Sequence, residues 1–179
     1  MNVDPQLPRI SIEDLEWFVN VRNSVSGNLH DPREFSVEQA REWISESNPD
    51  FRIISVDGHR AGYFRLSIDD ADPTCLWVGA DLSPEFQGKG IARAAYQTFL
   101  TVLAQEYSAS TIRLRVLPTN VRAIRLYLSL GFRTTHLDFD DAPDGRSLIL
   151  IDCTMERPTD ARLVAPPAQD PMYLIIGRV

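Results

Sequence analysis

The chain has 179 residues, of which 44% are hydrophobic and 24% are charged, and its formal net charge at pH 7 is −7. This balance is typical of one folded globular domain. A negative net charge disfavours non-specific binding to nucleic acid or to an anionic membrane, because both need a basic surface. It leaves room for a cationic or amine-bearing substrate, although an acidic balance also serves solubility alone.

The two cysteines, Cys75 and Cys153, lie in separate apolar runs and form neither a disulfide framework nor a zinc-binding pattern. Residues 1–9 lack the basic and apolar regions of a signal peptide. No run approaches the roughly 18 apolar residues of a membrane span. We therefore expect a cytoplasmic protein with no metal, no membrane partner and no nucleic-acid partner. A homodimer is possible, and the sequence leaves the oligomeric state open.

The first third of the chain is predicted to be helical. Ser11 has the residue type of an N-cap, and apolar residues then recur at helical spacing as far as Asn23. Residues 24–35 are polar and irregular, which indicates a loop. The capping-box pattern that begins at Ser36 predicts a second helix, which ends at Asn48 before a proline.

The periodicity then changes to that of strands. Residues 51–56, 59–68 and 75–82 predict an antiparallel meander, in which Asp57-Gly58 forms the first hairpin turn. Gly79 lies inside the third strand, and this position suggests either a bulge or a close approach by another chain or a ligand.

Two glycines, Gly88 and Gly90, mark the junction between the third strand and a helix predicted over 91–106. A helix N-terminus has unpaired N–H groups and a partial positive charge, and glycine lets an anion come close to them. The junction therefore predicts an anion site, which suits a phosphorylated cofactor.

A strand over 111–117 follows, and its crossover through the helix makes it parallel to the strand over 75–82. Asn120 is a suitable N-cap for a helix over 121–130, which Gly131 ends. Residues 132–139 and 147–153 predict a final antiparallel pair. We expect one domain over residues 1–156 and a proline-rich C-terminal tail over 157–179.

Two motifs in this order of elements resemble the GCN5-related N-acetyltransferase superfamily. The first is Gln87-Gly88-Lys89-Gly90-Ile91-Ala92, which fits the acetyl-CoA motif of that family. The second is the pattern N-x-x-A-x-x-L-Y-x-x-x-G-F, which runs from Asn120 to Phe132. The N-terminal third is loosely similar to ribosomal-protein, amino-sugar and polyamine N-acetyltransferases.

The resemblance implies a layered α/β fold. Its mixed, mostly antiparallel sheet of six to seven strands has a central, splayed parallel pair and is flanked by about four helices. It also implies acetyl-CoA as the cofactor. The expected cofactor-binding residues are Ala80, Asp81, Leu82, Gln87, Gly88, Lys89, Gly90, Ile91, Ala92, Asn120 and Tyr127.

For catalysis, the resemblance implies that the Leu82 N–H polarises the thioester carbonyl and that Tyr127 protonates the departing thiolate. A neutral phenol is available at pH 7, because its ordinary pKa is near 10. Tyr127 could instead be an ordinary core aromatic residue, and Asn120 could be an N-cap alone.

The general base stays open. Some family members carry a glutamate five positions before the motif asparagine, and this chain has Arg115 there. Asp81 and Glu85 lie near the cofactor motif, and a base relayed by water, or no dedicated base, is an alternative. The resemblance places Arg22, Asn23 and His30 at the wall of the acceptor site.

The leading hypothesis is an N-acetyltransferase of the acyltransferase class. It would move an acetyl group directly, in a ternary complex, to a primary amine of a small molecule or a protein N-terminus. One alternative is an acyltransferase that uses another acyl-CoA. Another is a catalytically degenerate relative that binds acyl-CoA, which the loss of the strand glutamate favours and the presence of Tyr127 disfavours.

Overall fold

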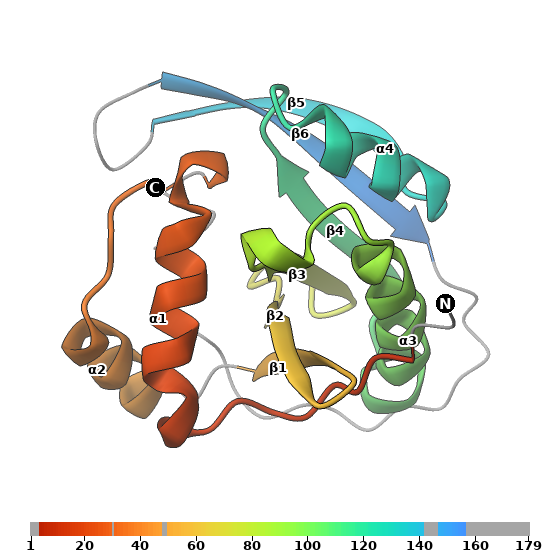
Figure 1. Ribbon diagram of the computed structural model, residues 1–179. Coiled ribbons are helices and arrows are strands. Elements are labelled where there is room, and N and C mark those ends of the chain that lie inside the picture. The colour runs from red at the N-terminus through yellow and green to blue at the C-terminus, as the bar shows by residue number, and fades with distance from the viewer. Residues whose placement is uncertain (1–3, 30, 48–49, 142–146, 157–179) are drawn as a thin grey trace.

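The computed structural model describes residues 4–29, 31–47, 50–141 and 147–156. A twisted sheet separates two pairs of helices (Figure 1). Helices α1 (Leu15–Ser24) and α2 (Val37–Ser47) lie on one side of the sheet. Helices α3 (Ile91–Glu106) and α4 (Val121–Ser129) lie on the other. The predicted layered α/β fold is thus confirmed.

The N-terminal helices begin near the predicted positions. A 3₁₀ turn, η1 (Ile12–Asp14), precedes α1, so the predicted helical run is 3₁₀ in its first turn. A second 3₁₀ turn, η2 (Ser26–Asn28), follows α1. The capping box before α2 is present, because the Ser36 N–H donates to Gln39 Oε1 at 2.8 Å and the Gln39 N–H donates to Ser36 Oγ at 3.2 Å.

In the described part of the chain, six strands form the sheet, in the order β1-β2-β3-β4-β6-β5. Among these strands β3 and β4 pair in parallel, and every other neighbouring pair is antiparallel. A 3₁₀ turn, η3 (Pro84–Phe86), links β3 to the turn before α3. The strands are β1 (Asp50–Val56), β2 (His59–Ile68), β3 (Cys75–Leu82), β4 (Thr111–Val116), β5 (Arg133–Asp141) and β6 (Ser147–Glu156).

Alternating side chains of the strands supply two hydrophobic cores, one on each face of the sheet. Under α3, Phe64 stacks on Phe99 with ring centroids 4.0 Å apart. Under α1, Phe18 packs against Phe51 and Tyr63 at 5.1 and 4.7 Å. The two faces of β2 therefore pack against different helices: Phe64 faces α3, and Tyr63 faces α1.

Gly79 does not form the bulge that was one of its two predicted explanations. The pairing of β2 with β3 runs through Gly79 without a register shift, and Gly79 lies opposite Arg65. A shift occurs instead between β1 and β2, at Ile54 and Ser55. The close approach at Gly79 comes from the chain itself, because a Cβ added there would lie 2.6 Å from Arg65 Nη2.

The predicted tail over 157–179 lies outside the described residues, as does the β5–β6 connection over 142–146. The proposed domain boundary therefore stays a prediction. Within the described part of the chain, no helix has both the length and the apolar character needed to cross a bilayer.

Candidate functional site

The two parallel strands separate partway along their length. Their pairing begins at Cys75 opposite Thr111 and ends at Trp77 opposite Arg113. Strand β3 nevertheless continues to Leu82, and β4 continues to Val116. Beyond the last pair, the facing edges of β3 and β4 leave a gap in the sheet, as the expected splayed pair requires.

The backbone of β3 has groups that face this gap. At one end of the β2–β3 ladder the Asp69 N–H donates to Cys75 O, and at the other the Ser83 N–H donates to Ala61 O, both at 2.9 Å. Bonded and non-bonded positions alternate along an antiparallel strand. The backbone groups of Ala80 and Leu82 therefore point away from β2, toward the gap.

Asp81 has the opposite orientation. It pairs with Tyr63, so its backbone faces β2, while its side chain lies on the face covered by α1 and is buried. Two of the three predicted cofactor-binding positions on β3 thus present backbone groups to the gap, and Asp81 presents a carboxylate beside it.

The turn before α3 has the geometry of an anion site. Gly88 and Gly90 have φ values of 74° and 80°, in the left-handed region that favours glycine. Gly90 is the N-cap residue of α3, and no side chain among the described residues caps this N-terminus. A Cβ built on either glycine would have no heavy atom within 4 Å, so the space above the turn is open. The residues present therefore fit a bound pyrophosphate.

The side chains of this turn have different roles. Gln87 Nε2 donates to Leu82 O at 2.9 Å, which ties the turn to the end of β3. This bond uses the Leu82 carbonyl and leaves the Leu82 N–H directed toward the gap. Lys89 is exposed, with its ammonium 5.8 Å from the centre of the Phe86 ring, and it can add positive charge near the turn.

Helix α4 closes the other side of the gap. Asn120 is its N-cap, because Asn120 Oδ1 accepts from the Ala123 N–H at 3.2 Å. Tyr127 is 8% exposed, and its ring packs edge-on against Tyr96 at 5.6 Å. Burial raises the pKa of Tyr127 above its ordinary value, so its phenol keeps its proton at neutral pH. A buried, protonated phenol suits the predicted role of acid.

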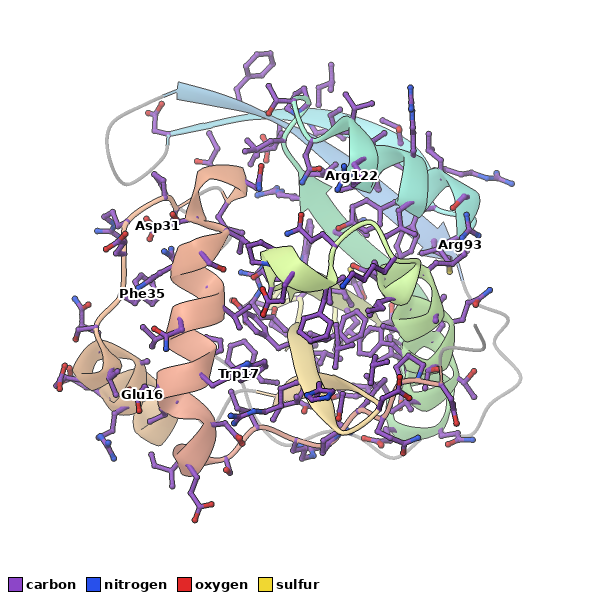
Figure 2. All side chains as sticks on the ribbon, viewed as in Figure 1. Glu16, Trp17, Asp31, Phe35, Arg93 and Arg122 are labelled. Carbon is purple, nitrogen blue, oxygen red and sulfur yellow. The ribbon has the colours of Figure 1, made fainter. Side chains whose placement is uncertain are left out.

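A direct contact joins the helices that flank the site. Arg93 extends from the first turn of α3, and its Nη2 donates to Ser129 Oγ at the end of α4 at 2.7 Å (Figure 2). Arg122, in the first turn of α4, is exposed. This exposed contact links the first turn of α3, next to the anion turn, to the end of α4, the helix that carries Tyr127.

A cluster of buried polar side chains lies at the gap, and the sequence did not predict it. Arg65 Nη2 lies 3.5 Å from Asp81 Oδ2. Four buried polar atoms have no hydrogen-bond partner among the described residues: Tyr63 Oη, Arg65 Nε, Asp81 Oδ2 and Tyr96 Oη. The available signal was the placement of Tyr63 and Arg65 at alternate positions of an apolar strand, with Gly79 on the next strand.

Arg115 occupies the position where some relatives have glutamate. Its guanidinium lies 5.1 Å from the centre of a Trp77 ring and 2.6 Å from Asp138 Oδ2 on β5. The position therefore carries a stacked, ion-paired cation. Glu85, another candidate base, is exposed in η3.

The predicted acceptor-site residues Arg22 and Asn23 hold a segment of backbone beside α1. The buried Arg22 guanidinium donates to the carbonyls of Asp31 and Arg33. Asn23 exchanges two hydrogen bonds with the Phe35 backbone, at 2.9 and 3.0 Å. Figure 2 shows Asp31 and Phe35 beside α1. His30 lies outside the described residues, and direct contact of all three with an acceptor stays a prediction.

The family model of the GNAT acetyltransferases matches residues 12–132, and the chain belongs to this family. The match covers both helical layers and the gap between β3 and β4, and it confirms the predicted family. It also supports acetyl-CoA as the cofactor. No curated protein matches the chain.

Solved structures share the fold at low sequence identity. A ribosomal-protein-alanine N-acetyltransferase from Brucella melitensis is 15% identical with a TM-score of 0.73, over 84% of this chain and 99% of that one. A phosphinothricin acetyltransferase from Sinorhizobium meliloti, solved with acetyl-CoA, is 18% identical with a TM-score of 0.72, over 94% and 98%. A ribosomal L7/L12 alpha-N-protein acetyltransferase, solved with coenzyme A, is 14% identical with a TM-score of 0.75, over 89% and 100%.

Proposed function

We propose that the protein is an acetyl-CoA-dependent N-acetyltransferase that acts on a primary amine of a small molecule or of a protein N-terminus. One observation carries the proposal. The backbone groups of Ala80 and Leu82 face the gap between β3 and β4, and the uncapped N-terminus of α3 lies at the end of the same strand. Acetyl-CoA fits this arrangement: its pyrophosphate suits the helix N-terminus, and its arm and thioester suit the free backbone groups of β3.

Each part of the site has a separate task. The N–H groups of the turn at Gly88 and Gly90 would hold the pyrophosphate. The Leu82 N–H would stabilise the negative charge that develops on the thioester oxygen. The buried phenol of Tyr127 would donate a proton to the departing sulfur, because its raised pKa keeps it protonated.

An amine acceptor is supported by the family and by the names of two structural neighbours, a ribosomal-protein-alanine N-acetyltransferase and a ribosomal L7/L12 alpha-N-protein acetyltransferase. A third neighbour is named for phosphinothricin. These neighbours are less than 20% identical to this chain. They support an amine as the proposed class of acceptor.

The degenerate-relative alternative also has a specific observation in its favour. Arg115, paired with Asp138, takes the place of a carboxylate on β4. A protein of this kind would bind acyl-CoA without turnover. The buried Tyr127 is the observation against it, because binding alone needs no acid at the sulfur.

A thiol-release assay separates the two functions. The protein is incubated with acetyl-CoA and a panel of amines: amino acids, an amino sugar, spermidine and peptides with free N-termini. CoA affinity is measured in parallel by calorimetry. Amine-dependent thiol release supports the transferase, and tight CoA binding without release from any amine contradicts it.

A further inference from the structure

A second buried tyrosine, Tyr96, lies beside Tyr127 on the side of the sheet that α3 and α4 cover. Tyr96 belongs to the second turn of α3, and Tyr127 belongs to α4. Their rings meet edge-on with centroids 5.6 Å apart, and both rings also pack edge-on against Phe132, at 6.5 and 5.9 Å. The exposed fraction is 2% for Tyr96 and 8% for Tyr127, so neither phenol is open to bulk water.

The Tyr96 hydroxyl is a buried donor that has no hydrogen-bond partner in the described part of the chain. Buried polar atoms are normally paired, because an unpaired hydroxyl has lost the hydrogen bonds it makes in water. The ring itself is held in place, since Phe64 and Phe99 contact it edge-on at 5.0 and 6.3 Å between centroids. A donor that is fixed by packing and unused at rest suits a negative charge that appears only during a reaction.

Tyr127 needs such a donor if it is the acid of the reaction. Burial raises the pKa of its phenol above the ordinary value of 10.0, whereas the ordinary pKa of a thiol is about 8.5. Proton transfer from this phenol to a thiolate is therefore uphill, because it leaves a phenolate in a buried place. A hydrogen bond from a second hydroxyl would stabilise the phenolate, since a donor bonds most strongly to a charged acceptor.

The electrostatics of the two phenols agree with donation from Tyr96 to Tyr127. Burial is the largest cause that raises the pKa of Tyr127, and the Tyr96 hydroxyl acts against it by donating to the ionised oxygen. Burial also raises the pKa of Tyr96, and the charge of an ionised Tyr127 raises it further, so Tyr96 keeps its proton. From other elements, Arg65 on β2 lowers both pKa values, Asp81 on β3 raises both, and Cys153 on β6 raises that of Tyr127.

We propose that Tyr96 is a positioning residue whose hydroxyl donates a hydrogen bond to the Tyr127 oxygen as Tyr127 gives up its proton. This proposal rests on the proposed function. The neutral amine attacks the thioester carbon, the C–N bond forms, the C–S bond breaks, and the sulfur takes the proton of Tyr127. The phenolate accepts from Tyr96 until a proton from solvent restores it, and the nitrogen releases its extra proton to solvent. Tyr96 keeps its own proton throughout.

The test compares Tyr96→Phe with Tyr107→Phe, each made in the full-length wild type and in the Tyr127→Phe variant. Tyr107 is another buried tyrosine, 5% exposed, at the C-cap of α3. Tyr96→Phe should fold, because it keeps the ring and removes a hydroxyl that no described residue bonds. The value of kcat is measured at saturating acetyl-CoA with an amine on which the wild type is active, and CoA affinity is measured by calorimetry.

For Tyr96→Phe we expect kcat to fall by about tenfold and CoA affinity to stay unchanged. In the Tyr127→Phe background the same change should cause no further loss, because the phenolate that it stabilises cannot form. Tyr107→Phe should keep the kcat of its background. An equal loss from Tyr96→Phe in both backgrounds indicates a merely structural residue. That result, or wild-type kcat in Tyr96→Phe, overturns the proposal and leaves the proposed function intact.

A second measurement needs no turnover. A fluorinated tyrosine, whose phenol ionises at a lower pH than that of tyrosine, is placed at position 127, and its pKa is measured by ¹⁹F NMR in the ligand-free protein. Tyr96→Phe should raise this pKa by about one unit or more, and Tyr107→Phe should leave it unchanged. If Tyr96→Phe does not fold, Tyr96→Met takes its place in both experiments.

The two readouts separate the two proposals. A wild type that acetylates no amine overturns the proposed function, and the NMR comparison still decides whether Tyr96 stabilises the phenolate. An unchanged pKa at position 127 without the Tyr96 hydroxyl overturns the role of Tyr96, whatever the activity of the wild type.

Discussion

The guanidinium of Arg65 lies directly over Gly79, so closely that a Cβ at Gly79 would come within 2.6 Å of Nη2 and 2.8 Å of Nε. Gly79 occurs just beyond Trp77, where β3 stops pairing with β4. The absence of a side chain at this position therefore lets Arg65 extend from β2 across β3 to the point where the sheet opens. Asp81 lies on the same face and completes the ion pair.

Gly79→Ala should displace Arg65 and weaken its pairing with Asp81. The clashing atoms belong to the end of a flexible side chain, so we expect the free energy of unfolding to fall by only about 1–2 kcal/mol. The acetylation rate should fall by a larger factor than the small decrease in folded protein would cause. Thermal denaturation and acetylation rate measure the two effects.

Gly27→Ala is the matched control, because a Cβ at Gly27 would meet nothing within 4 Å and Gly27 has no positive φ. It should leave both stability and turnover near wild-type values. Full activity of Gly79→Ala would show that the position of Arg65 does not matter.

Gly90→Ala tests the anion turn. Alanine at the φ of 80° should cost about 1–2 kcal/mol of stability and turn the N–H groups away from the bound phosphate. We expect CoA affinity to fall by about tenfold or more, measured by calorimetry. Gly58→Ala has a similar φ of 77°, in the β1–β2 hairpin. It should lose similar stability and keep its CoA affinity, and equal losses of affinity in both variants would contradict the assignment of the turn.

Tyr127→Phe removes the proposed acid and keeps the aromatic ring. The value of kcat should fall by about 100-fold, because the thiolate loses its proton donor, while the CoA dissociation constant stays nearly unchanged. Tyr107→Phe, which changes another buried tyrosine at the end of α3, is the control for losing a hydroxyl. Unchanged turnover in Tyr127→Phe would exclude the phenol as the acid.

The three tyrosines at the gap predict a loss of stability at alkaline pH. Burial raises the pKa of Tyr63, Tyr96 and Tyr127 above the ordinary value of 10.0. The folded protein therefore keeps protons that the unfolded chain releases. The stabilisation is complete below about pH 10, and above it stability falls by about 1.4 kcal/mol per pH unit for each tyrosine until the folded-state pKa is reached.

Absorbance and circular dichroism during an alkaline titration measure this behaviour. The tyrosinate signal of the three buried phenols should rise together with the loss of secondary structure. Ionisation of these tyrosines near pH 10 in a protein that is still folded would show that the phenols are accessible to water. The variants Tyr63→Phe, Tyr96→Phe and Tyr127→Phe assign the signal.

Local signals in the sequence were sufficient for most of the fold. The hairpin at Asp57-Gly58, the N-cap at Asn120 and the helix end at Gly131 all have the predicted backbone, because each depends on residues close in the chain. The anion turn was recognisable for the same reason, because Gly88 and Gly90 directly precede helix α3 in the sequence.

The buried cluster could not be predicted in the same way. Arg65 and Asp81 come from neighbouring strands, and they meet only because the register places Arg65 opposite Gly79 and Tyr63 opposite Asp81. A one-residue change of register would move these side chains to the other face of the sheet. The alternation of Tyr63 and Arg65 along an apolar strand was a local signal, but it does not say which residues of β3 lie opposite them, so the ion pair was missed and Gly79 received two alternative explanations.

The most direct test of the account is mass spectrometry of an amine panel after incubation with the protein and isotopically labelled acetyl-CoA. At least one primary amine should gain the labelled acetyl group, in step with the release of free CoA. Gly90→Ala should reduce this product through weaker CoA binding, and Tyr127→Phe should reduce it at saturating CoA. Tight binding of acetyl-CoA with no labelled amine in the panel would contradict the account.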